Sequence, residues 1–511
     1  MNGWSFFQET FPHVKASKNN LKTIQTDKKE REPITLLRKR TFEDIEKLEQ
    51  IYYKEKASKE KDKGYAEARI KSKISIASPD DVESLISKRC NILMTGKAGT
   101  GKTTRLRKIA QKLTSSKRQF AVLAPTGIAA KNAGGVTIHS FLKLTITPWL
   151  PNIKNEDSDR LKDDDIKMLR LLDVLIIDEI SMVRCDLMDQ MDFVIRKARK
   201  INEPFGGVQL ILFGDLFQLM PVVTEEDYNI LKKAYKTPYF FSSKVFECMS
   251  FHVVNLKKIY RQDDLRFIGI LNSVRKGNIS PFELCDLNDR FSSAYENECP
   301  PGSLRIATHN RQADAHNRKK LDEINGEERD YKATIEPYPN RTGWAYIDKR
   351  DWPTDYHLKL KVGAHVMFVK NDIAGKQYVN GTMGIVTRLG CDYVTVITHE
   401  GKLIDVKKES WWFERYRYDK LSKRIYREPY AIFNQLPLRL AWCVTVHKSQ
   451  GLTFDNIYLD LSKSFTFGQV YVALSRCKTL QGIHLIKRII PSNIKTDPVV
   501  VEFYKTIGID D

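Results

Sequence analysis

The stretch 91–103 reads NILMTGKAGTGKT. Its first five residues, 91–95, form a short apolar run typical of a buried strand, and residues 96–103 fit the pattern G-x-x-x-x-G-K-[ST] in full. Glycines at these positions let backbone N–H groups surround phosphate oxygens, and a following helix adds the partial positive charge of its N-terminus. A helical pattern over 103–113 does follow. We therefore expect a strand, a phosphate-binding loop and a helix within an α/β fold.

Further short apolar runs follow this loop, with amphipathic helical patterns between them. Such alternation predicts βαβ units, in which helices cover both faces of a parallel sheet. The strand candidates of this region are 91–95, 120–124, 174–177 and 208–213, and the helical patterns include 103–113 and 187–197.

A second α/β pattern begins near residue 256 and is interrupted over 345–436. There, β-branched runs such as 362–369, 384–388 and 393–398 are separated by Gly and Asn turns, which predicts a small inserted β-barrel. At the other end, the Lys- and Glu-rich segment 54–73 is typical of a solvated helix or a flexible arm. The expected organisation is a charged N-terminal extension (1–75), a first domain (76–255) with a polar excursion (142–170), a second domain in two parts (256–344 and 437–511) and an inserted barrel (345–436).

Two carboxylates, Asp178 and Glu179, close the apolar run 174–177. Ligands of parallel sheets bind at the C-terminal ends of the strands, so these side chains are expected beside the phosphate loop. Asp178 is suited to complete a Mg²⁺ site, and Glu179 to position the attacking water or accept its proton. Gln218 ends the next apolar run in GDLFQLMP (214–221), where an amide can sense the γ-phosphate, although a lone Gln there is more often a turn residue.

The composition favours an anionic partner and excludes several classes of protein. The 511 residues carry 84 Lys and Arg against 64 Asp and Glu, a formal charge of +20, which favours nucleic acid, although basic surfaces also serve solubility. No apolar run approaches the ~20 residues of a membrane helix. The N-terminus lacks a secretion signal, and the scattered cysteines lack metal-site spacing. We expect an intracellular protein that is neither secreted nor bound to a membrane; cytoplasm, nucleoid, nucleus and mitochondrion all stay open.

Seven sequence blocks occur in a fixed order along the chain. They are GKAGTGKT (96–103), APTGIAAKNAGG with TIHSF (124–141), IIDEISM (176–182), GGVQLILFGDLFQLMPV (206–222), YRQ (260–262), VHKSQGLTF (446–454) and GQVYVALSRC (468–477). Together they resemble the petite-integration-frequency (PIF-type) DNA helicases, RecD-like members of superfamily 1 group B. The resemblance extends over about residues 90–488.

This resemblance implies two RecA-like P-loop domains with ATP and Mg²⁺ in the cleft between them. It implies 5′-to-3′ translocation on single-stranded DNA, unwinding at single-strand/double-strand junctions, and a role in DNA replication, repair, recombination or genome maintenance. A monomeric motor is one option, and a protein partner for the N-terminal extension stays open. By position, the catalytic residues are Lys102, Asp178, Glu179, Gln218, Arg261 and Arg476. The nucleotide-binding residues are Gly96, Lys97, Ala98, Gly99, Thr100, Gly101, Lys102, Thr103, Thr104 and Gly451, and Thr103 and Asp178 are the metal ligands.

The DNA track is also implied by position. Its candidates are Thr126, His139, Ser140, Phe141, Asn310, Thr445, His447 and Lys448. His139 and Phe141 are suited to stack on bases, or else to pack in the core. The excursion 142–170 stands where the family has its strand-separating wedge. The segment 402–427 interleaves basic and aromatic residues, which is typical of a nucleic-acid face and equally of a hairpin with one buried aromatic side.

The sequence also departs from the family pattern. No Gln lies between Gln50 and Gly96, where the family usually has one that recognises adenine, so adenine selectivity is not predicted. Two other functions stay open. One is a translocase or remodeller on DNA or RNA that does not unwind duplex. The other is a DNA-binding protein switched by nucleotide without turnover, although the presence of Asp178, Glu179, Gln218 and Arg476 argues against it.

Overall fold

The computed structural model describes most of the chain from residue 73 onward, within one compact unit that spans Arg69–Asp511. The predicted extension 1–75 therefore lies outside the described residues, except for its last three. Within the described part, a helix with the length and hydropathy of a membrane span is not found. The described residues are 73–151, 160–296, 303–307, 309–338, 346–372, 375, 377–419, 421, 424–446, 449, 451–462, 464 and 466–509.

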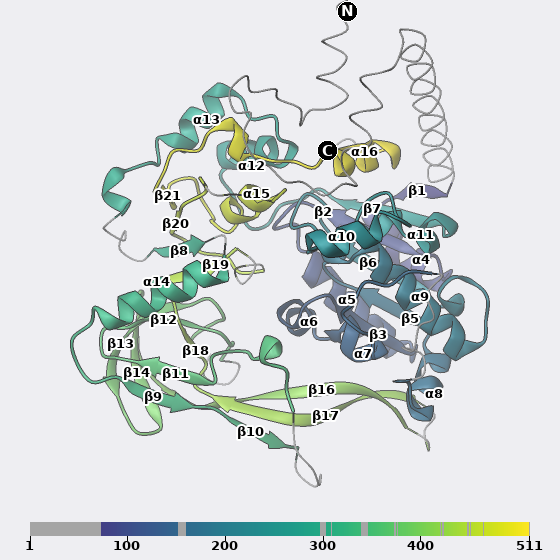
Figure 1. The fold of residues 1–511 in the computed structure, drawn as a ribbon, viewed down its shortest axis with the longest axis horizontal. Helices are drawn as coiled ribbons and strands as arrows, with labels where there is room; N and C mark the ends of the chain where they lie inside the picture. Colours follow the sequence, from purple (N-terminus) through teal and green to yellow (C-terminus); the bar gives the residue numbers. More distant parts are fainter. Residues whose placement is uncertain are drawn as a thin grey trace, which may run out of the picture. The chain divides into compact units, whose positions relative to one another are not determined.

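A seven-stranded sheet carries the phosphate loop, in the order β1-β7-β2-β6-β5-β3-β4 (Figure 1). All of its strand pairs are parallel, as the alternating pattern predicts. The strands are β1 (Ile74–Ala77), β2 (Ile92–Gly96), β3 (Phe120–Ala124), β4 (Val136–Thr137), β5 (Val174–Ile177), β6 (Gln209–Gly214) and β7 (Phe251–Leu256). The helices are α4 (Val82–Ser87), α5 (Lys102–Ser115), α6 (Gly127–Ala133), α7 (Ile138–Leu142), α8 (Asp163–Leu171), α9 (Cys185–Arg199), α10 (Glu225–Leu231) and α11 (Lys244–Cys248). We call this sheet and its helices the first lobe.

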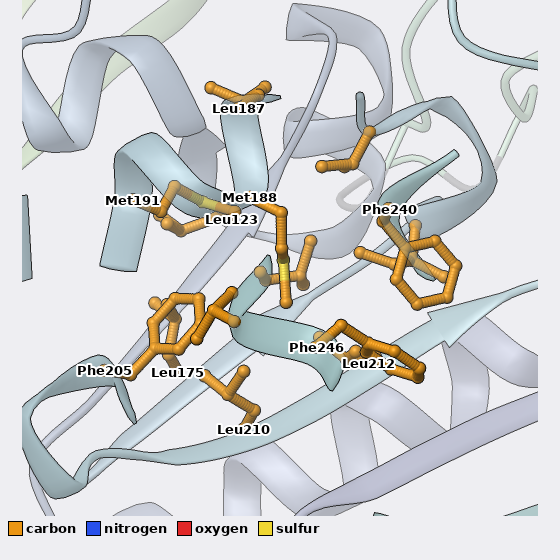
Figure 2. Packing of buried hydrophobic residues seen from close by; sticks show 14 of the residues in the cluster. Leu123, Leu175, Leu187, Met188, Met191, Phe205, Leu210, Leu212, Phe240 and Phe246 are labelled. Carbon is orange, nitrogen blue, oxygen red and sulfur yellow. The ribbon is translucent and has the colours of Figure 1, made fainter. Parts of the chain in front are cut away.

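Both faces of this sheet are buried. Along β2, Ile92 and Met94 belong to one hydrophobic cluster, whereas Leu93 between them belongs to another, because successive side chains of a strand point to opposite faces. Figure 2 shows the second of these clusters, in which Leu175 of β5 lies near Met188 of α9. The unbroken apolar runs of the sequence follow from this two-sided burial.

A second, four-stranded parallel sheet has the order β19-β8-β20-β21. Its strands are β8 (Leu304–Ala307), β19 (Cys443–Thr445), β20 (Ile457–Leu459) and β21 (Ile483–Leu485), and the helices of this part are α12 (Leu265–Lys276), α13 (Pro281–Asn288), α14 (Asn310–Asp322) and α15 (Gln469–Leu474). We call this sheet and these helices the second lobe. The two parallel sheets confirm the predicted α/β class.

The last helix, α16 (Pro498–Thr506), packs against the core of the first lobe. Phe503 stacks on Phe241 with ring centroids 4.1 Å apart, and Tyr504 stacks on Phe217 at 4.9 Å. The predicted second domain runs to residue 511, but the apolar side chains of α16 are buried with those of the first lobe. The sequence pattern shows only that the helix is amphipathic, and not which core it covers.

Between β8 and β19 the chain forms antiparallel sheets around a core of its own. These strands begin at Arg329, ahead of the predicted start at 345. Closure into a barrel stays a prediction, because the five-stranded sheet runs from β15 to β18 and, among the described residues, these two end strands do not pair with each other. The five strands, in sheet order, are β15 (Leu403–Lys407), β14 (Tyr393–Thr398), β13 (Met383–Leu389), β12 (His365–Phe368) and β18 (Leu438–Leu440). Beside them lie the pair β11 (His357–Leu360) and β9 (Arg329–Lys332), and the trio β10 (Thr334–Pro337), β17 (Arg424–Gln435) and β16 (Glu409–Asp419).

The two longest strands, β16 and β17, form a hairpin that contacts the first lobe (Figure 1). Strand β4 has two residues and pairs only with the end of β3, so the N–H of Val122 has no partner strand there. The hydroxyl of Tyr416 accepts a hydrogen bond from this N–H at 3.0 Å. Nearby, the N–H of Ile425 donates to Gln119 Oε1 at 2.7 Å, and Arg427 donates to the carbonyl oxygen of Gly134 at 2.7 Å. We call these three bonds the hairpin contact.

Candidate nucleotide and nucleic-acid site

The phosphate loop joins the C-terminal end of β2 to the first turn of α5. Gly99 and Gly101 have φ angles of 81° and 78°, a left-handed conformation that side chains disfavour. A Cβ added to Gly99 would also lie 2.6 Å from the Cβ of Arg261, which follows β7. The N–H of Tyr260 donates to the carbonyl oxygen of Gly99 at 2.9 Å. The glycines therefore serve both the shape of the loop and the close approach of the 260–262 segment.

Lys102 is the first residue of α5 and folds back over the loop. Its Nζ donates to the carbonyl oxygens of Gly96 at 2.7 Å and Lys97 at 3.0 Å. Burial lowers its pKa, although the carboxylates of Asp215 and Glu179 oppose this effect. An ammonium held in this way lies where the β- and γ-phosphates of a nucleotide are expected.

Asp178 and Glu179 follow β5, next to the loop. The N–H of Glu179 donates to Asp178 Oδ1 at 3.0 Å, and Glu179 itself has a left-handed φ of 52°. Burial and the neighbouring Glu179 raise the pKa of Asp178 to about 7. Two adjacent carboxylates, of which Asp178 is buried and Glu179 half-buried, favour a cation, because a nearby positive charge relieves both the desolvation and their mutual repulsion.

A cavity of about 470 Å³ brings most of the predicted nucleotide residues together from both lobes, although Gly96 and Lys97 are not in its lining. The first lobe supplies the phosphate loop, Glu179 and Gln218, and the chain beyond β7 supplies both predicted arginines. The cavity is lined by Ala98, Gly99, Thr100, Gly101, Lys102, Thr103, Thr104, Glu179, Gln218, Tyr260, Arg261, Gly451, Thr453, Arg476 and Lys478. Asp178 lies beside it, in an adjoining cavity that shares Thr103, Glu179 and Gly451.

The two arginines are held by backbone carbonyl groups. Arg261 donates to the carbonyl oxygen of Ser475 at 3.1 Å, and the Nε of Arg476 donates to that of Val472 at 2.9 Å. Arg476 is 2% exposed, and burial together with the charge of Arg261 lowers its pKa to about 9. Two guanidinium groups at a shared cavity, one buried and one half-buried, are suited to bind a concentrated negative charge.

Beneath this cavity, Asp215 accepts hydrogen bonds from several elements. Gln218 Nε2 donates to its Oδ2 at 3.2 Å, Arg275 Nη2 to its Oδ1 at 3.0 Å, and the Tyr471 hydroxyl to its Oδ2 at 3.3 Å. Tyr471 Oη in turn accepts from the N–H of Ala98 in the phosphate loop at 2.9 Å. We call these five residues the Asp215 network. Burial by itself would raise the pKa of Asp215, but Arg275 and Lys102 hold it below its usual value.

The predicted DNA residues are brought together only in part. Thr126 is exposed and caps α6 through a bond from the N–H of Ala129 at 3.3 Å; in α7, His139 is half-buried and Ser140 is exposed. The ring of Phe141 is 3% exposed and packs edge-on against Tyr416, as in the core-packing alternative, so its place in the DNA track stays a prediction. Thr445 is buried as well.

Thr445 lies in β19 and is 1% exposed, because the second sheet buries it. Asn310 begins α14, but its side chain lies outside the described residues, as do His447 and Lys448. Within the segment 402–427, buried and exposed side chains alternate, as expected for a hairpin with one buried aromatic side: Trp411 is buried and Trp412 is exposed.

The second cavity, of about 680 Å³, lies between the first lobe and the inserted region, and residues of both line it. From the first lobe it takes Thr126, Ile128 and Asn132, which lie in or next to α6. The insertion contributes one aromatic side chain, Trp352, and several polar ones. The complete lining is Thr103, Arg107, Thr126, Ile128, Ala129, Asn132, Asp178, Glu179, Met182, Lys349, Trp352, Thr354, Asp355, Asn371, Asn380, Arg439, Gly451 and Leu452.

Comparison with known proteins decides the family. The model of the PIF1-like helicases matches residues 80–283. The ATP-dependent DNA helicase Pif1 of Bdellovibrio bacteriovorus is 33% identical over 416 residues, which cover 81% of this chain and 88% of that protein. The chain belongs to the PIF1-like helicase family. The human ATP-dependent DNA helicase PIF1 is 32% identical over 425 residues, or 82% of this chain, and the match spans 61% of the human protein.

Solved structures of PIF1-like helicases share the fold. The complex of Bacteroides sp Pif1 with ADP-AlF4 is 38% identical, with 84% of this chain and 96% of that chain covered and a TM-score of 0.76. Bacteroides Pif1 bound to ssDNA is 38% identical as well, with coverage of 83% and 95%, and has a TM-score of 0.60. The described arrangement thus lies nearer to the first structure than to the second.

Several residues of this PIF1-like site were not predicted. Asp215 and Tyr471 lie within the quoted blocks, but their types gave no sign of a shared contact. Arg275, in α12, lies outside every block. Trp352 and Arg439 line the second cavity from the inserted region, where the sequence offers no local pattern. Their placement depends on contacts between distant segments.

Proposed function

We propose that this chain is an ATP-dependent DNA helicase that moves 5′ to 3′ along single-stranded DNA and unwinds duplex. The observation that carries the proposal is the 470 Å³ cavity, in which the phosphate loop and Glu179 of one lobe face Arg261 and Arg476. A cavity lined by two lobes can change shape when its nucleotide is hydrolysed, which is how a motor couples chemistry to movement. Membership of the PIF1-like family supports this function.

The residues of the cavity have complementary roles in hydrolysis. Lys102 and the loop amides hold the phosphates, and Glu179 positions the attacking water and accepts its proton. Gln218 senses the γ-phosphate. Arg261 and Arg476 neutralise the charge that develops on the transferred phosphoryl group, an effect worth about 10³–10⁵ in kcat for arginines placed in this way.

Thr103 and Asp178 fit a Mg²⁺ ion that accompanies the nucleotide. Both line the second cavity beside Glu179, and hydroxyl and carboxylate oxygens are the ligands that Mg²⁺ prefers. Among the described residues, no cluster of three or more His, Cys, Asp or Glu side chains converges on a metal position. That finding suits Mg²⁺, which is usually held by one or two protein ligands together with phosphates. The ion would neutralise charge on the β- and γ-phosphate oxygens.

The second cavity is our candidate for part of the DNA track. It joins Thr126 of the first lobe to Trp352 and Arg439 of the insertion, and so offers hydroxyl, aromatic and cationic groups to one strand. Arg439→Gln should reduce the salt slope of single-stranded DNA binding by about 1, as expected for one lost phosphate contact. Arg388→Gln is the control, since Arg388 is exposed on β13 and lines neither cavity. An equal slope in both variants would remove Arg439 from the track.

The preferred substrate, assembly and compartment follow from the same proposal. Relatives described as bound to ssDNA and at forked dsDNA support single-stranded DNA and junctions as partners. We expect a monomer to suffice, since both lobes of the nucleotide cavity come from one chain, and we expect the protein to work in an intracellular compartment that contains DNA.

The deciding experiment measures unwinding of a partial duplex that carries a 5′ or a 3′ single-stranded tail, with ATP and Mg²⁺. Glu179→Gln is the blank. Activity on the 5′-tailed substrate alone, lost in the variant, is expected. Opening of the 3′-tailed substrate would contradict the polarity. No opening of either, with ATP hydrolysis still stimulated by single-stranded DNA, would favour the translocase; absence of any turnover would favour the nucleotide-switched binding protein.

A further inference from the structure

The Asp215 network begins in the phosphate loop and ends in the second lobe. The Ala98 N–H donates to the hydroxyl oxygen of Tyr471 at 2.9 Å, and that hydroxyl has one proton, which it can give to Asp215 at 3.3 Å. The direction of each bond is therefore fixed. Tyr471 lies in α15 and is 4% exposed. One phenol thus joins a loop amide of the first lobe to a carboxylate under the cavity.

Arg275 supplies the positive charge that keeps Asp215 ionised. It reaches the carboxylate from α12 at 3.0 Å, and both side chains are 0% exposed. Its guanidinium also lies over the ring of Phe217, 4.1 Å from the centroid. A buried ion pair of this kind is strongly destabilised when one partner is removed, because the other charge stays buried without compensation. The pair therefore favours the arrangement in which α12 lies against the 215–218 turn.

Gln218 is the member of the network that faces the nucleotide cavity. Its amide nitrogen donates to Asp215 at 3.2 Å, while the residue also lines the cavity. The N-terminus of α15 packs directly on this turn: a Cβ added to Gly468 would overlap the carbonyl oxygens of Phe217 and Gln218. The orientation of Gln218 is thus determined by elements of the second lobe as well as by its own strand.

We propose that Tyr471 and Arg275 are positioning residues that connect the phosphate loop and Gln218 to the second lobe through Asp215. Neither lines the nucleotide cavity, so both act through other groups. When the lobes close, the network fixes the positions of the Gln218 amide and the Ala98 N–H at the same time. When the lobes separate, both groups lose these hydrogen bonds. This inference rests on the proposed ATP hydrolysis and adds residues that make hydrolysis depend on closure.

The first test replaces Tyr471 by Phe, which removes only the hydroxyl group. We expect kcat for DNA-stimulated ATP hydrolysis to fall at least ~10-fold, the loss for a hydrogen bond to a charged group, with less than a ~3-fold change in KM for ATP. Tyr239→Phe is the matched control: Tyr239 is also buried and donates to a carboxylate, Asp497, at 2.7 Å, but lines neither cavity. Equal kcat values for the two variants would overturn the proposal.

A second readout does not depend on catalysis. Hydrogen exchange of the peptide that contains Ala98 should become faster in Tyr471→Phe, because its N–H loses a buried acceptor, and should not change in Tyr239→Phe. Unchanged exchange in Tyr471→Phe would contradict the network even if the wild-type protein proved inactive. Absence of ATP hydrolysis in the wild type would instead contradict the proposed function.

The third experiment distinguishes an effect of Arg275 on the position of other groups from an effect on the stability of the fold. Arg275→Met should lower the melting temperature, and Asp215→Asn combined with Arg275→Met should recover much of it, because no unpaired charge stays buried. We expect kcat of the double variant to stay at least ~10-fold below wild type, since an amide at position 215 holds Tyr471 and Gln218 less strongly. A double variant with wild-type kcat would show that the pair serves stability alone, and would overturn the proposal for Arg275.

Discussion

Two of the contacts that join the first lobe to the rest of the chain differ in character. The Asp215 network is buried and contains an ion pair in which both side chains are 0% exposed. The hairpin contact is made mostly of neutral backbone and side-chain groups, and its one cation, Arg427, is exposed. Buried charges demand accurate geometry. In the hairpin contact the bond from Val122 to Tyr416 is buried but neutral, and the other two bonds lie nearer to solvent, where a bond is exchanged for water at little cost. The network is therefore suited to report closure of the lobes, and the hairpin contact to open and re-form.

The largest difference in kcat is expected between the substitution of an arginine beside the Asp215 network and that of an arginine of the hairpin contact. Arg476→Ala should lower kcat for ATP hydrolysis by about 10³, because a guanidinium at the γ-phosphate position is lost. Arg427→Ala should leave kcat within a factor of about 2, since the described contacts of this side chain are a carbonyl oxygen of Gly134 and the carboxylate of Glu414, both away from the nucleotide cavity. Steady-state hydrolysis at saturating ATP measures both. Comparable losses in the two variants would refute the division of roles.

The second largest difference between the two contacts is expected in their contribution to the free energy of unfolding. Arg275→Met leaves Asp215 buried and unpaired, and should reduce the free energy of unfolding of the first lobe by about 3 kcal/mol. Lys131→Met removes the cation that lies 4.9 Å from the ring centroid of Trp411, close to the hairpin contact, and should cost less than about 1 kcal/mol. Denaturant melts followed by tryptophan fluorescence and by circular dichroism provide the comparison. A larger cost for Lys131 would mean that the hairpin is the stronger tie.

The smallest effect on stability is expected when one hydrogen bond of the hairpin contact is removed. Tyr416→Phe keeps the ring against Phe141 but leaves the Val122 N–H without its acceptor, at a cost of about 1 kcal/mol. Hydrogen exchange over 119–124 should therefore become faster, while exchange of the phosphate loop should not change. Tyr418→Phe serves as the control, because among the described residues it is the ring of Tyr418, and not its hydroxyl group, that contacts the first lobe, at Lys167. Faster exchange of the phosphate loop would show that the two contacts are coupled.

The nucleotide cavity was largely predictable from the sequence, because its chemistry depends on short-range order. The loop 96–103, the carboxylates after β5 and Gln218 after β6 are each fixed by a strand end, and parallel strands bring their ends to the same edge. The strand candidates 120–124 and 174–177 coincide with β3 and β5. Arg261 and Arg476 could be placed only through the family resemblance.

The predicted DNA track was less reliable, because exposure depends on which surfaces pack together. Phe141 is buried in part because Tyr416, about 275 residues later, packs edge-on against it. Nothing near Phe141 in the sequence indicates that contact. Arg275 and the placement of α16 were missed for the same reason: a charged residue or an amphipathic helix shows that a partner exists, but not which one.

The packing of α16 also bears on biosynthesis. Phe503 and Tyr504 complete the core of a lobe whose strands are translated much earlier, from β1 to β7. As the nascent chain leaves the ribosome, the first lobe can pair its strands, but Phe241 lacks Phe503 and Phe217 lacks Tyr504 until α16 emerges. The newly made protein therefore carries an uncovered aromatic surface throughout the synthesis of its second half, the kind of surface that chaperones bind.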